Sequence, residues 1–394
     1  MSRWLHLLCW LALAAGAVAA EPGMLLEGKA TAVARDRDAT LWSIDGSGGN
    51  VIATLDGARW LSHAVVGLNE HVRPVSLATL PDGDVGCLWE DHSESDDSWA
   101  VTRHRAGKSW LWVRFHATLR DPALLGRRDG SAIVTESGRS VVLLAADANP
   151  ATVTTLAKGN FVTPKKNDDG SESSDFAPVR AVEDRSGCLW LWNPGQVRQS
   201  WKWHLAGLVR WDPASPAERL CRIGKGEPPI SQVVAWDEQR IALAVAGTGP
   251  FFAPNDGSKF EPMPTPDADA FRYVEQFFHD GSAWHAVTTP QPTDYKVENS
   301  AIQSRIAFRV LRFYDVSKPV CALWKYSDEH WSRIFDGLDK DPAASPRPWL
   351  RMATGLFLGS DQSAPWFFPA APEAKPRRLA SAHLFPLPRT AQMA

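Results

Sequence analysis

The chain of 394 residues lacks an excess of either charge. It contains 42 Lys and Arg against 45 Asp and Glu, which gives a formal net charge of −3. So small an imbalance gives no reason to expect a nucleic acid or a membrane surface as partner. The composition is 44% hydrophobic with 28 Gly and 29 Pro, which is typical of a folded protein with many turns.

Long hydrophobic runs are also absent after the N-terminus. Residues 1–20 combine a basic Arg3, an apolar stretch over Leu5–Ala15, and an Ala17-Val18-Ala19 cleavage signal. This pattern predicts a signal peptide, and an uncleaved anchor or a buried helix is the alternative. No later stretch approaches the roughly 20 apolar residues that a spanning helix needs. We therefore expect export to the periplasm or the extracellular space, without a membrane span.

Cysteine is scarce, and none of it follows metal-binding spacing. Four cysteines remain after the predicted signal peptide: Cys87, Cys188, Cys221 and Cys321. There is no C-x-x-C and no Cys/His pair at zinc spacing, so we expect no structural metal and no cofactor. Cys87 and Cys188 share the local string Gly-Cys-Leu-Trp. Equivalent positions in non-adjacent repeats would be too far apart for a disulfide, which favours both as small buried side chains. The three full pairings of four cysteines stay open.

Sustained helical periodicity is missing, and a repeating unit takes its place. A short apolar run, a charged turn and a second apolar run recur, most clearly in residues 30–44, 75–90 and 179–192. The aligned positions on the second run are Trp42, Trp89, Val134, Trp190, Leu243, Trp284 and Phe357. Most are spaced by roughly the 40–50 residues of a four-stranded propeller blade.

These units predict an all-β fold, a β-propeller of about seven four-stranded blades. We expect one domain over residues 21–387, followed by a C-terminal tail over 388–394. Residues near Glu21–Leu26 would pair with the last blade and close the ring. In the fourth blade we expect strands near Val179–Glu183, Cys188–Asn193, Leu205–Trp211 and Glu218–Ile223.

The strongest unit, Glu183-Asp184-Arg185-Ser186-Gly187-Cys188-Leu189-Trp190, resembles the two-component regulator propeller repeat, whose consensus reads E-D-R-x-G-x-L-W. Residues 36–42 match it with Ala39 in place of Gly. The resemblance implies a propeller that binds a ligand or a protein, in a family where such propellers often serve as periplasmic sensors of histidine kinases. The sequence has no spanning helix and no kinase region, so we do not expect kinase signalling.

Loop length distinguishes the two ends of the predicted blades. With strands labelled A to D in each blade, A–B and C–D turns lie at one end, and B–C and D–A connections lie at the other. The long segments fall in the second class, among them Lys158–Pro178, Pro194–His204 and Pro290–Ser304. Because loops on a rigid scaffold commonly carry recognition, we predict that this end binds a partner. Neutral decoration of a tolerant face is the alternative.

Candidate ligand-binding residues lie on these long segments: Trp201, Trp203, His204 and Tyr295. Trp201 and Trp203 share one side of an extended strand and could stack on a sugar ring, although burial between blades is the commoner fate of such side chains. For Trp99, Trp110 and Trp112 we expect burial.

No residue pattern identifies a catalytic group. The adjacent acids Glu183-Asp184 and Glu90-Asp91 are better explained by turn stabilisation than by glycoside hydrolysis. That reaction needs two acids roughly 5–10 Å apart, and adjacent residues on a strand point to opposite faces. The acidic run Asp91–Asp97 lacks calcium-loop spacing, so a solvated loop is favoured.

The predicted function is therefore non-catalytic binding of a protein or a glycan through the loop-rich face. A glycan-active enzyme with a central pocket and a structural component of an envelope assembly are the alternatives. The sequence leaves the oligomeric state open.

Overall fold

The structure is a computed structural model. It describes residues 33–38, 40–44, 52–56, 59–63, 67–68, 71–92, 98–117, 119, 122–135, 140–144, 153–158, 165–166, 172–173, 180–192, 208–212, 218–221, 230–302, 305–314, 321–338, 349–352, 355–358, 366–371 and 373–378. The predicted signal peptide, the ring-closing segment and the C-terminal tail lie outside these ranges. No helix among the described residues has the length and apolar character needed to cross a membrane.

The described strands form seven four-stranded antiparallel sheets. The first contains β1 (Val33–Arg35), β2 (Leu41–Ile44), β3 (Ile52–Asp56) and β4 (Arg59–His63). The second contains β5 (Val72–Thr79), β6 (Val85–Asp91), β7 (Ser98–Arg105) and β8 (Lys108–His116). The third contains β9 (Ala123–Gly126), β10 (Ala132–Thr135), β11 (Ser140–Leu144) and β12 (Val153–Lys158). The fourth contains β15 (Arg180–Glu183), β16 (Leu189–Trp192), β17 (Leu208–Trp211) and β18 (Glu218–Cys221).

The remaining three sheets follow the same order, with one interruption. The fifth contains β19 (Ile230–Ala235), β20 (Arg240–Val245), β21 (Gly249–Pro254) and β22 (Glu261–Pro262). A 3-10 helix η1 (Ala270–Tyr273) precedes the sixth, which contains β23 (Val274–His279), β24 (Trp284–Thr288), β27 (Cys321–Ser327) and β28 (His330–Leu338). The seventh contains β29 (Trp349–Met352), β30 (Gly355–Leu358), β31 (Trp366–Pro369) and β32 (Arg377–Arg378).

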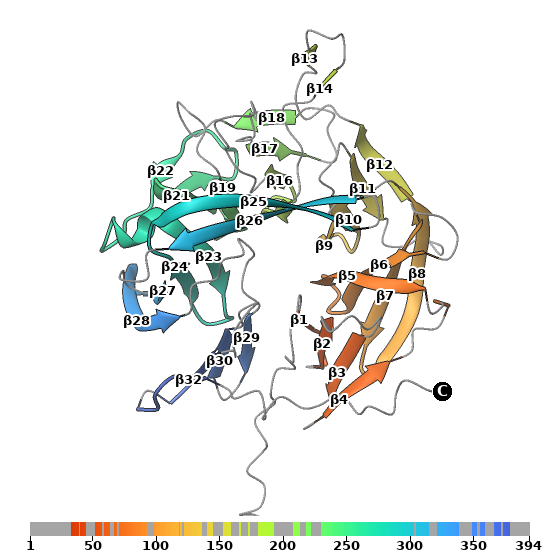
Figure 1. The fold of residues 1–394 in the computed structure, drawn as a ribbon, viewed down its shortest axis with the longest axis horizontal. Coiled ribbons are helices and arrows are strands. Elements are labelled where there is room, and N and C mark those ends of the chain that lie inside the picture. Colours follow the sequence, from red (N-terminus) through yellow and green to blue (C-terminus); the bar gives the residue numbers. More distant parts are fainter. Residues whose placement is uncertain are drawn as a thin grey trace, which may run out of the picture.

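Two hairpins stand outside these sheets. β13 (Lys165–Lys166) pairs with β14 (Glu172–Ser173) in the connection between the third and fourth sheets. β25 (Pro292–Ile302) pairs with β26 (Arg305–Tyr314) between β24 and β27. Figure 1 shows the seven sheets arranged around a ring in chain order, which is the β-propeller that the repeats predict.

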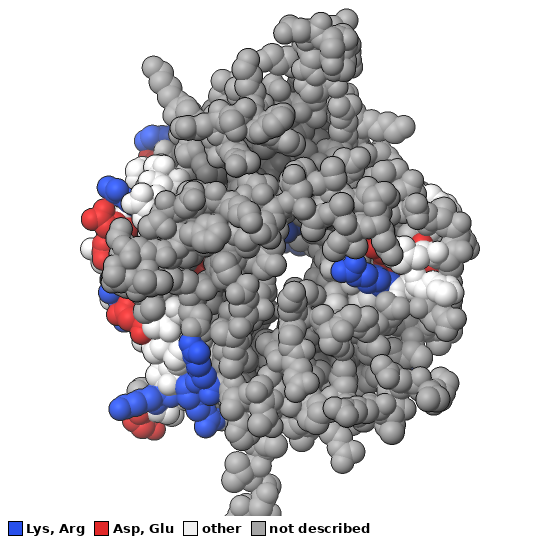
Figure 2. All heavy atoms as spheres, in the orientation of Figure 1, with Lys and Arg blue, Asp and Glu red and all other residues white. Residues whose placement is uncertain are grey.

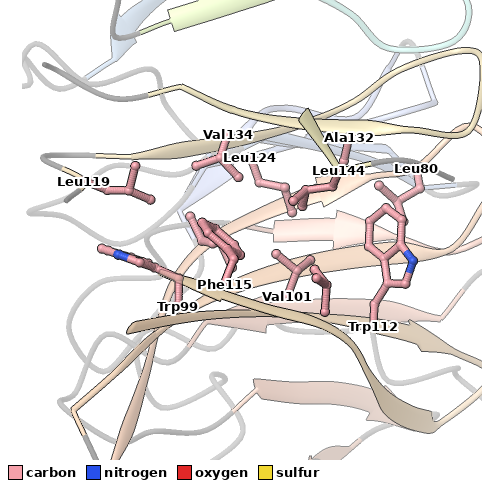
Figure 3. Packing of buried hydrophobic residues seen from close by; sticks show 12 residues of the cluster. Leu80, Trp99, Val101, Trp112, Phe115, Leu119, Leu124, Ala132, Val134 and Leu144 are labelled. Atoms are coloured by element: carbon pink, nitrogen blue, oxygen red, sulfur yellow. The ribbon is translucent and has the colours of Figure 1, made fainter. Parts of the chain in front are cut away.

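Buried hydrophobic side chains lie between successive sheets. The cluster between the second and third sheets, drawn in Figure 3, contains Trp99, Val101 and Phe115 of the second sheet against Leu124 and Val134 of the third. Further clusters fill each of the remaining gaps between successive sheets, from the first sheet to the seventh. Each sheet from the second to the sixth therefore buries both faces, which explains why many of their strands read as nearly continuous apolar runs.

The repeat positions aligned in the sequence all fall on the second strand of a sheet, in β2, β6, β10, β16, β20, β24 and β30. The four strands predicted for the fourth sheet are also confirmed, each slightly shorter than expected. Local turn chemistry and a large apolar residue at a fixed offset were thus sufficient to locate these strands.

Candidate functional site

The predicted binding residues are only partly covered by the structure. Trp201, Trp203 and His204 lie outside the described residues. Tyr295 lies in β25, where its backbone is paired with that of Arg312 in β26. The structure therefore places one of the four candidates, and it places that one on the hairpin β25–β26.

This hairpin corrects the prediction of a loop over Pro290–Ser304. The segment is strand β25, and the chain returns through β26 in a register that runs from Pro292 opposite Tyr314 to Ile302 opposite Arg305. The β-branched and aromatic residues of both segments favour extended pairing, which explains the strands. Because β24 and β27 are strands B and C of the sixth sheet, the hairpin is a B–C connection and leaves the sheet at the predicted binding end.

The hairpin extends well beyond its own sheet. Figure 1 shows β25 and β26 running from the sixth sheet across the ring toward β10 and β11. Among the described residues, the two strands pair only with each other. The structure is therefore a ring of sheets from which the two-stranded hairpin β25–β26 projects.

The opposite end carries the A–B turns, and there a buried aspartate organises the repeat. In the fourth sheet Asp184 Oδ1 accepts hydrogen bonds from the backbone N–H of Ser186 (2.8 Å) and Cys188 (3.1 Å), and Oδ2 accepts one from Trp190 Nε1 (2.8 Å). In the first sheet Asp36 accepts from Thr40 N (2.8 Å) and Trp42 Nε1 (3.1 Å) in the same way. The recurring Asp and Trp thus fasten the turn to the second strand, as expected for turn stabilisation.

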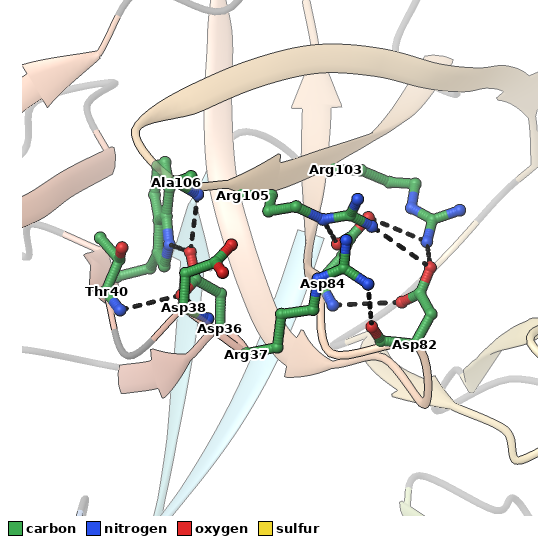
Figure 4. Close-up of polar contacts among 10 residues, drawn as sticks. Asp36, Arg37, Asp38, Thr40, Asp82, Asp84, Arg103, Arg105 and Ala106 are labelled. Carbon is green, nitrogen blue, oxygen red and sulfur yellow. Dashed lines mark hydrogen bonds and ion pairs between the residues drawn. The ribbon is translucent and has the colours of Figure 1, made fainter.

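Arginine–aspartate pairs stabilise the A–B turn of the second sheet, next to a backbone contact with the first sheet (Figure 4). Arg103 and Arg105, both on β7, form ion pairs with the buried Asp84 and with Asp82. The Arg37 backbone N–H donates to the Gly83 carbonyl across the gap between the sheets (2.7 Å).

Burial, and secondarily the neighbouring Arg105, lowers the pKa of Arg103 from its ordinary value. The ion pairs therefore fix this turn to strand β7 of the same sheet, and the backbone bond from Arg37 joins it to the first sheet.

Comparable contacts join the third, fourth and fifth sheets. Glu183 on β15 faces Arg127 across the gap (3.3 Å) and accepts the backbone N–H of Arg128 (2.7 Å). Arg185 Nε in the fourth sheet lies 3.5 Å from Glu238 Oε1 in the fifth sheet. Sequence analysis assigned Glu183 to its own turn, but its partners belong to the preceding sheet. Patterns within one repeat contain no information on that neighbour.

A buried histidine and aspartate lie between the sixth and seventh sheets. His285 Nε2 is 3.1 Å from Asp280 Oδ2, and Arg351 of the seventh sheet approaches the same oxygen at 3.3 Å. Burial lowers the pKa of His285, an effect that the nearby Asp280 opposes without reversing it. A neutral imidazole can donate Nε2–H to Asp280, which leaves the buried Nδ1 as an acceptor without a hydrogen-bond partner.

The same aspartate is held in its charged form by its own turn. Burial alone would raise the pKa of Asp280, but hydrogen bonds from the Ser282 hydroxyl and from the backbone N–H groups of Ser282 and Ala283 lower it well below its usual range. His285 stacks on Phe278 with ring centroids 5.0 Å apart, so the pair is enclosed by aromatic packing. Sequence analysis assigned no role to this histidine, because its partner Arg351 is distant in the chain.

A second buried histidine, His104, lies in the second sheet. Trp89 Nε1 donates to Thr102 Oγ1 (2.7 Å), Thr102 Oγ1 contacts His104 Nε2 (2.7 Å), and His104 Nδ1 contacts Ser109 Oγ (2.7 Å). The histidine is fully buried, so a substrate has no access to it. This chain of hydrogen bonds satisfies the polar groups of the sheet interior.

The other side chains singled out in the sequence have mixed outcomes. Trp99 and Trp112 are buried as expected, whereas Trp110 is 36% exposed on the outer strand β8, which corrects its assignment to the core. Cys87 and Cys188 are free and buried, and Cys321 is buried as well. Among the described residues, no group of His, Cys, Asp and Glu is arranged to hold a metal ion.

Charge on the described surface is mixed. On the side shown in Figure 2, basic and acidic side chains alternate along the left-hand rim, over β22, β28 and β32. Lys259 and Glu261 pair there at 2.5 Å, and Arg333 pairs with Asp267 at 3.2 Å. The visible part of the described surface therefore offers no patch of a single sign.

Comparison with known proteins supports the architecture. A chain of the Mitotic Checkpoint Complex matches with a TM-score of 0.51 and 10% identity, over 86% of this chain and 90% of that one. A streptogramin B lyase structure matches with a TM-score of 0.50 and 11% identity, over 86% and 94%. The WD40 β-propeller domain of Doa1 also matches, with a TM-score of 0.47 and 8% identity over 86% and 92%.

At these identities the first two matches, with TM-scores of 0.51 and 0.50, establish the fold alone. No protein-family model and no curated protein sequence matches the chain.

Proposed function

We propose that this chain is an exported β-propeller that binds a protein partner on the end from which its B–C connections leave. One observation carries the proposal: the B–C connection of the sixth sheet is the hairpin β25–β26, which projects from the sheet across the ring. A rigid ring with a projecting ribbon suits recognition, because the scaffold fixes the position of the binding element.

The opposite end supports this choice of face. Its prominent charged side chains, including Asp84, Arg103, Glu183 and Asp280, contact turns or neighbouring sheets. Glu183 and Asp280 join neighbouring sheets, and Arg103 holds Asp84 within the second sheet. The sixth sheet is complete without the hairpin, because Thr288 of β24 pairs directly with Ala322 of β27.

Three finer features belong to the same proposal. The seven four-stranded sheets are the blades of one closed ring. The E-D-R-x-G-x-L-W unit at Glu183–Trp190 supports kinship with the two-component regulator propeller repeats. The signal-peptide pattern of residues 1–20 supports export to the periplasm or beyond.

The test uses protein from Glu21 onward on peptide, protein and glycan arrays. It is compared with a variant in which residues 291–316 are replaced by a short Gly-Ser turn, and with a Trp201→Ala, Trp203→Ala variant. A short turn can join the cut ends because Thr288 and Ala322 are cross-strand neighbours. Circular dichroism checks that each variant is folded.

Specific polypeptide binding that is lost on hairpin replacement supports the proposal. Glycan binding that depends on Trp201 and Trp203 and survives hairpin replacement would replace it with carbohydrate recognition. Turnover of any arrayed glycan would assign an enzyme instead.

A further inference from the structure

We infer that the partner contributes an extended, acidic segment that adds as a third strand to the open edge of β26; this inference rests on the proposed function. The described residues form a sheet of only two strands here, β25 and β26, of 11 and 10 residues. In an antiparallel pair, every second residue of a strand directs its backbone N–H and C=O away from its partner. A strand as long as β26 therefore presents a row of hydrogen-bonding groups, and an extended peptide satisfies them by strand addition.

The two edges of the ribbon differ in ways that favour β26. β25 begins with Pro292, whose nitrogen cannot donate a hydrogen bond, and its register with β26 shifts between Pro292 and Asp294. Proline and irregular register are common protections of an edge. β26 contains neither proline nor glycine over Arg305–Tyr314.

The charges of β26 identify the chemistry of the segment. The strand reads Arg-Ile-Ala-Phe-Arg-Val-Leu-Arg-Phe-Tyr, with three arginines and no acid. In the register, Arg309 lies opposite Glu298, whereas Arg305 lies opposite Ile302 and Arg312 opposite Tyr295. Cross-strand opposite charges stabilise a sheet and like charges destabilise it. A third strand on this edge is therefore favoured when it carries Asp or Glu.

The same charges disfavour a second copy of this chain as the occupant. Antiparallel pairing of β26 with β26 brings the arginines of one copy near those of the other, because Arg305 and Arg312 lie near opposite ends of the strand. Juxtaposed like charges suppress such a contact. An acidic segment of another protein meets both the backbone and the charge requirement.

The experiment measures binding of fluorescent peptides of about nine residues, a length that matches a strand-addition site. One peptide alternates Glu with Val and Thr, and a second has Lys in place of each Glu. Two further acidic peptides carry N-methyl groups on alternate residues, one peptide at the odd positions and the other at the even positions. A methyl group blocks strand addition only where that N–H faces β26.

We expect the acidic peptide to bind at least about tenfold more tightly than the lysine peptide. One N-methyl phase should abolish binding and the other should preserve it. A variant with Arg305→Ser, Arg309→Ser and Arg312→Ser should bind at least about tenfold more weakly. The control variant Arg185→Ser, Lys259→Ser removes exposed cations at the A–B end and should bind as the unmodified protein does.

Several outcomes would overturn the inference. Equal binding of both methylated peptides would show electrostatic attraction without strand addition, and equal binding of acidic and basic peptides would contradict the charge argument. A dimer in sedimentation analysis that hairpin replacement abolishes would assign the edge to a second copy. If an arrayed protein requires the hairpin while none of these peptides binds, the strand inference fails and the proposed function stands.

Discussion

The buried Asp184 gives a quantitative test of how the repeat works. Replacing it with Ala removes the acceptor for the Ser186 and Cys188 backbone N–H groups and for Trp190 Nε1–H. Trp190 is fully buried and Cys188 nearly so, whereas water can reach Ser186. Each buried donor left without a partner costs about 1–3 kcal/mol. Two such donors predict that Asp184→Ala lowers the free energy of unfolding by about 2–6 kcal/mol.

Urea denaturation followed by tryptophan fluorescence measures this difference. Asp237 provides the matched control, since it accepts the same kind of turn N–H bonds from Gln239 (2.9 Å) and Arg240 (2.8 Å) near the surface. Water replaces that acceptor, so Asp237→Ala should cost about 1 kcal/mol or less.

A double-mutant cycle then isolates the bond to the indole. Trp190→Phe keeps much of the ring volume and removes the donor, so it should cost about 1–2 kcal/mol. With the donor already absent, Asp184→Ala should cost less, giving a coupling of about 1–2 kcal/mol. Strict additivity, or an Asp184→Ala effect no larger than that of Asp237→Ala, would refute the view that this carboxylate fastens the turn to the second strand.

Three further predictions concern other parts of the ring. Because the pKa of His285 is lowered on folding, the unfolded chain binds the proton more readily, and the free energy of unfolding should fall as pH decreases from about 7 to about 5. In His285→Gln that decline should be shallower, by at most about 1.4 kcal/mol per pH unit for one proton. Gly126→Ala would place a Cβ 2.8 Å from the Thr79 carbonyl oxygen of the adjacent sheet and should cost about 1–3 kcal/mol in urea denaturation. The buried thiols should resist alkylation in the native protein and react on unfolding, as read by mass spectrometry: Cys87, Cys188 and Cys321.

Each of these has a defined contrary result. An unchanged pH profile in His285→Gln would mean that this histidine does not titrate differently on folding. The substitution Gly187→Ala serves as a control that separates backbone strain from a steric clash. Gly187 has a φ of +84°, which is strained for other residues, but a Cβ added there would meet nothing within 4 Å. If Gly187→Ala costs as much as Gly126→Ala, close packing of the sheets is not the cause. Rapid alkylation of these thiols in the native protein would contradict their burial.

Features encoded within one repeat were predictable from sequence. The charged turn and the large apolar residue after it located second strands correctly, because Asp36 and Asp184 bond to side chains only six residues away. The turn, the aspartate and the tryptophan form one local unit. Their spacing therefore survives in the sequence as a visible pattern.

Contacts between repeats were not predictable in this way. The partners of Glu183 and Asp280 include Arg127 and Arg351, which belong to neighbouring sheets. Trp110 resembles Trp112 in sequence but lies exposed, because the β7–β8 register shifts and changes the alternation along β8. Such outcomes depend on three-dimensional neighbours that a repeat pattern does not specify.

The hairpin was missed for a different reason, although a signal for it was present. The distance in sequence from Trp284 to Phe357 is well above the usual length of a blade, and Arg305–Tyr314 is rich in β-branched and aromatic residues. A four-strand template leaves no place for an additional pair of strands, so Pro290–Ser304 was predicted to be a loop.

Their position explains what such an insertion can do. Strands β24 and β27 pair directly across Thr288 and Ala322, so the sixth sheet is complete without the hairpin. The sequence of β26 is therefore not required for blade pairing, and three arginines on one open-edged strand need another explanation. Elsewhere in the ring, arginines such as Arg127 and Arg351 form ion pairs between neighbouring sheets. The arginines of β26 lie on a hairpin that the sheets do not need for their pairing. This is the physical reason to look for the partner of these arginines outside this chain.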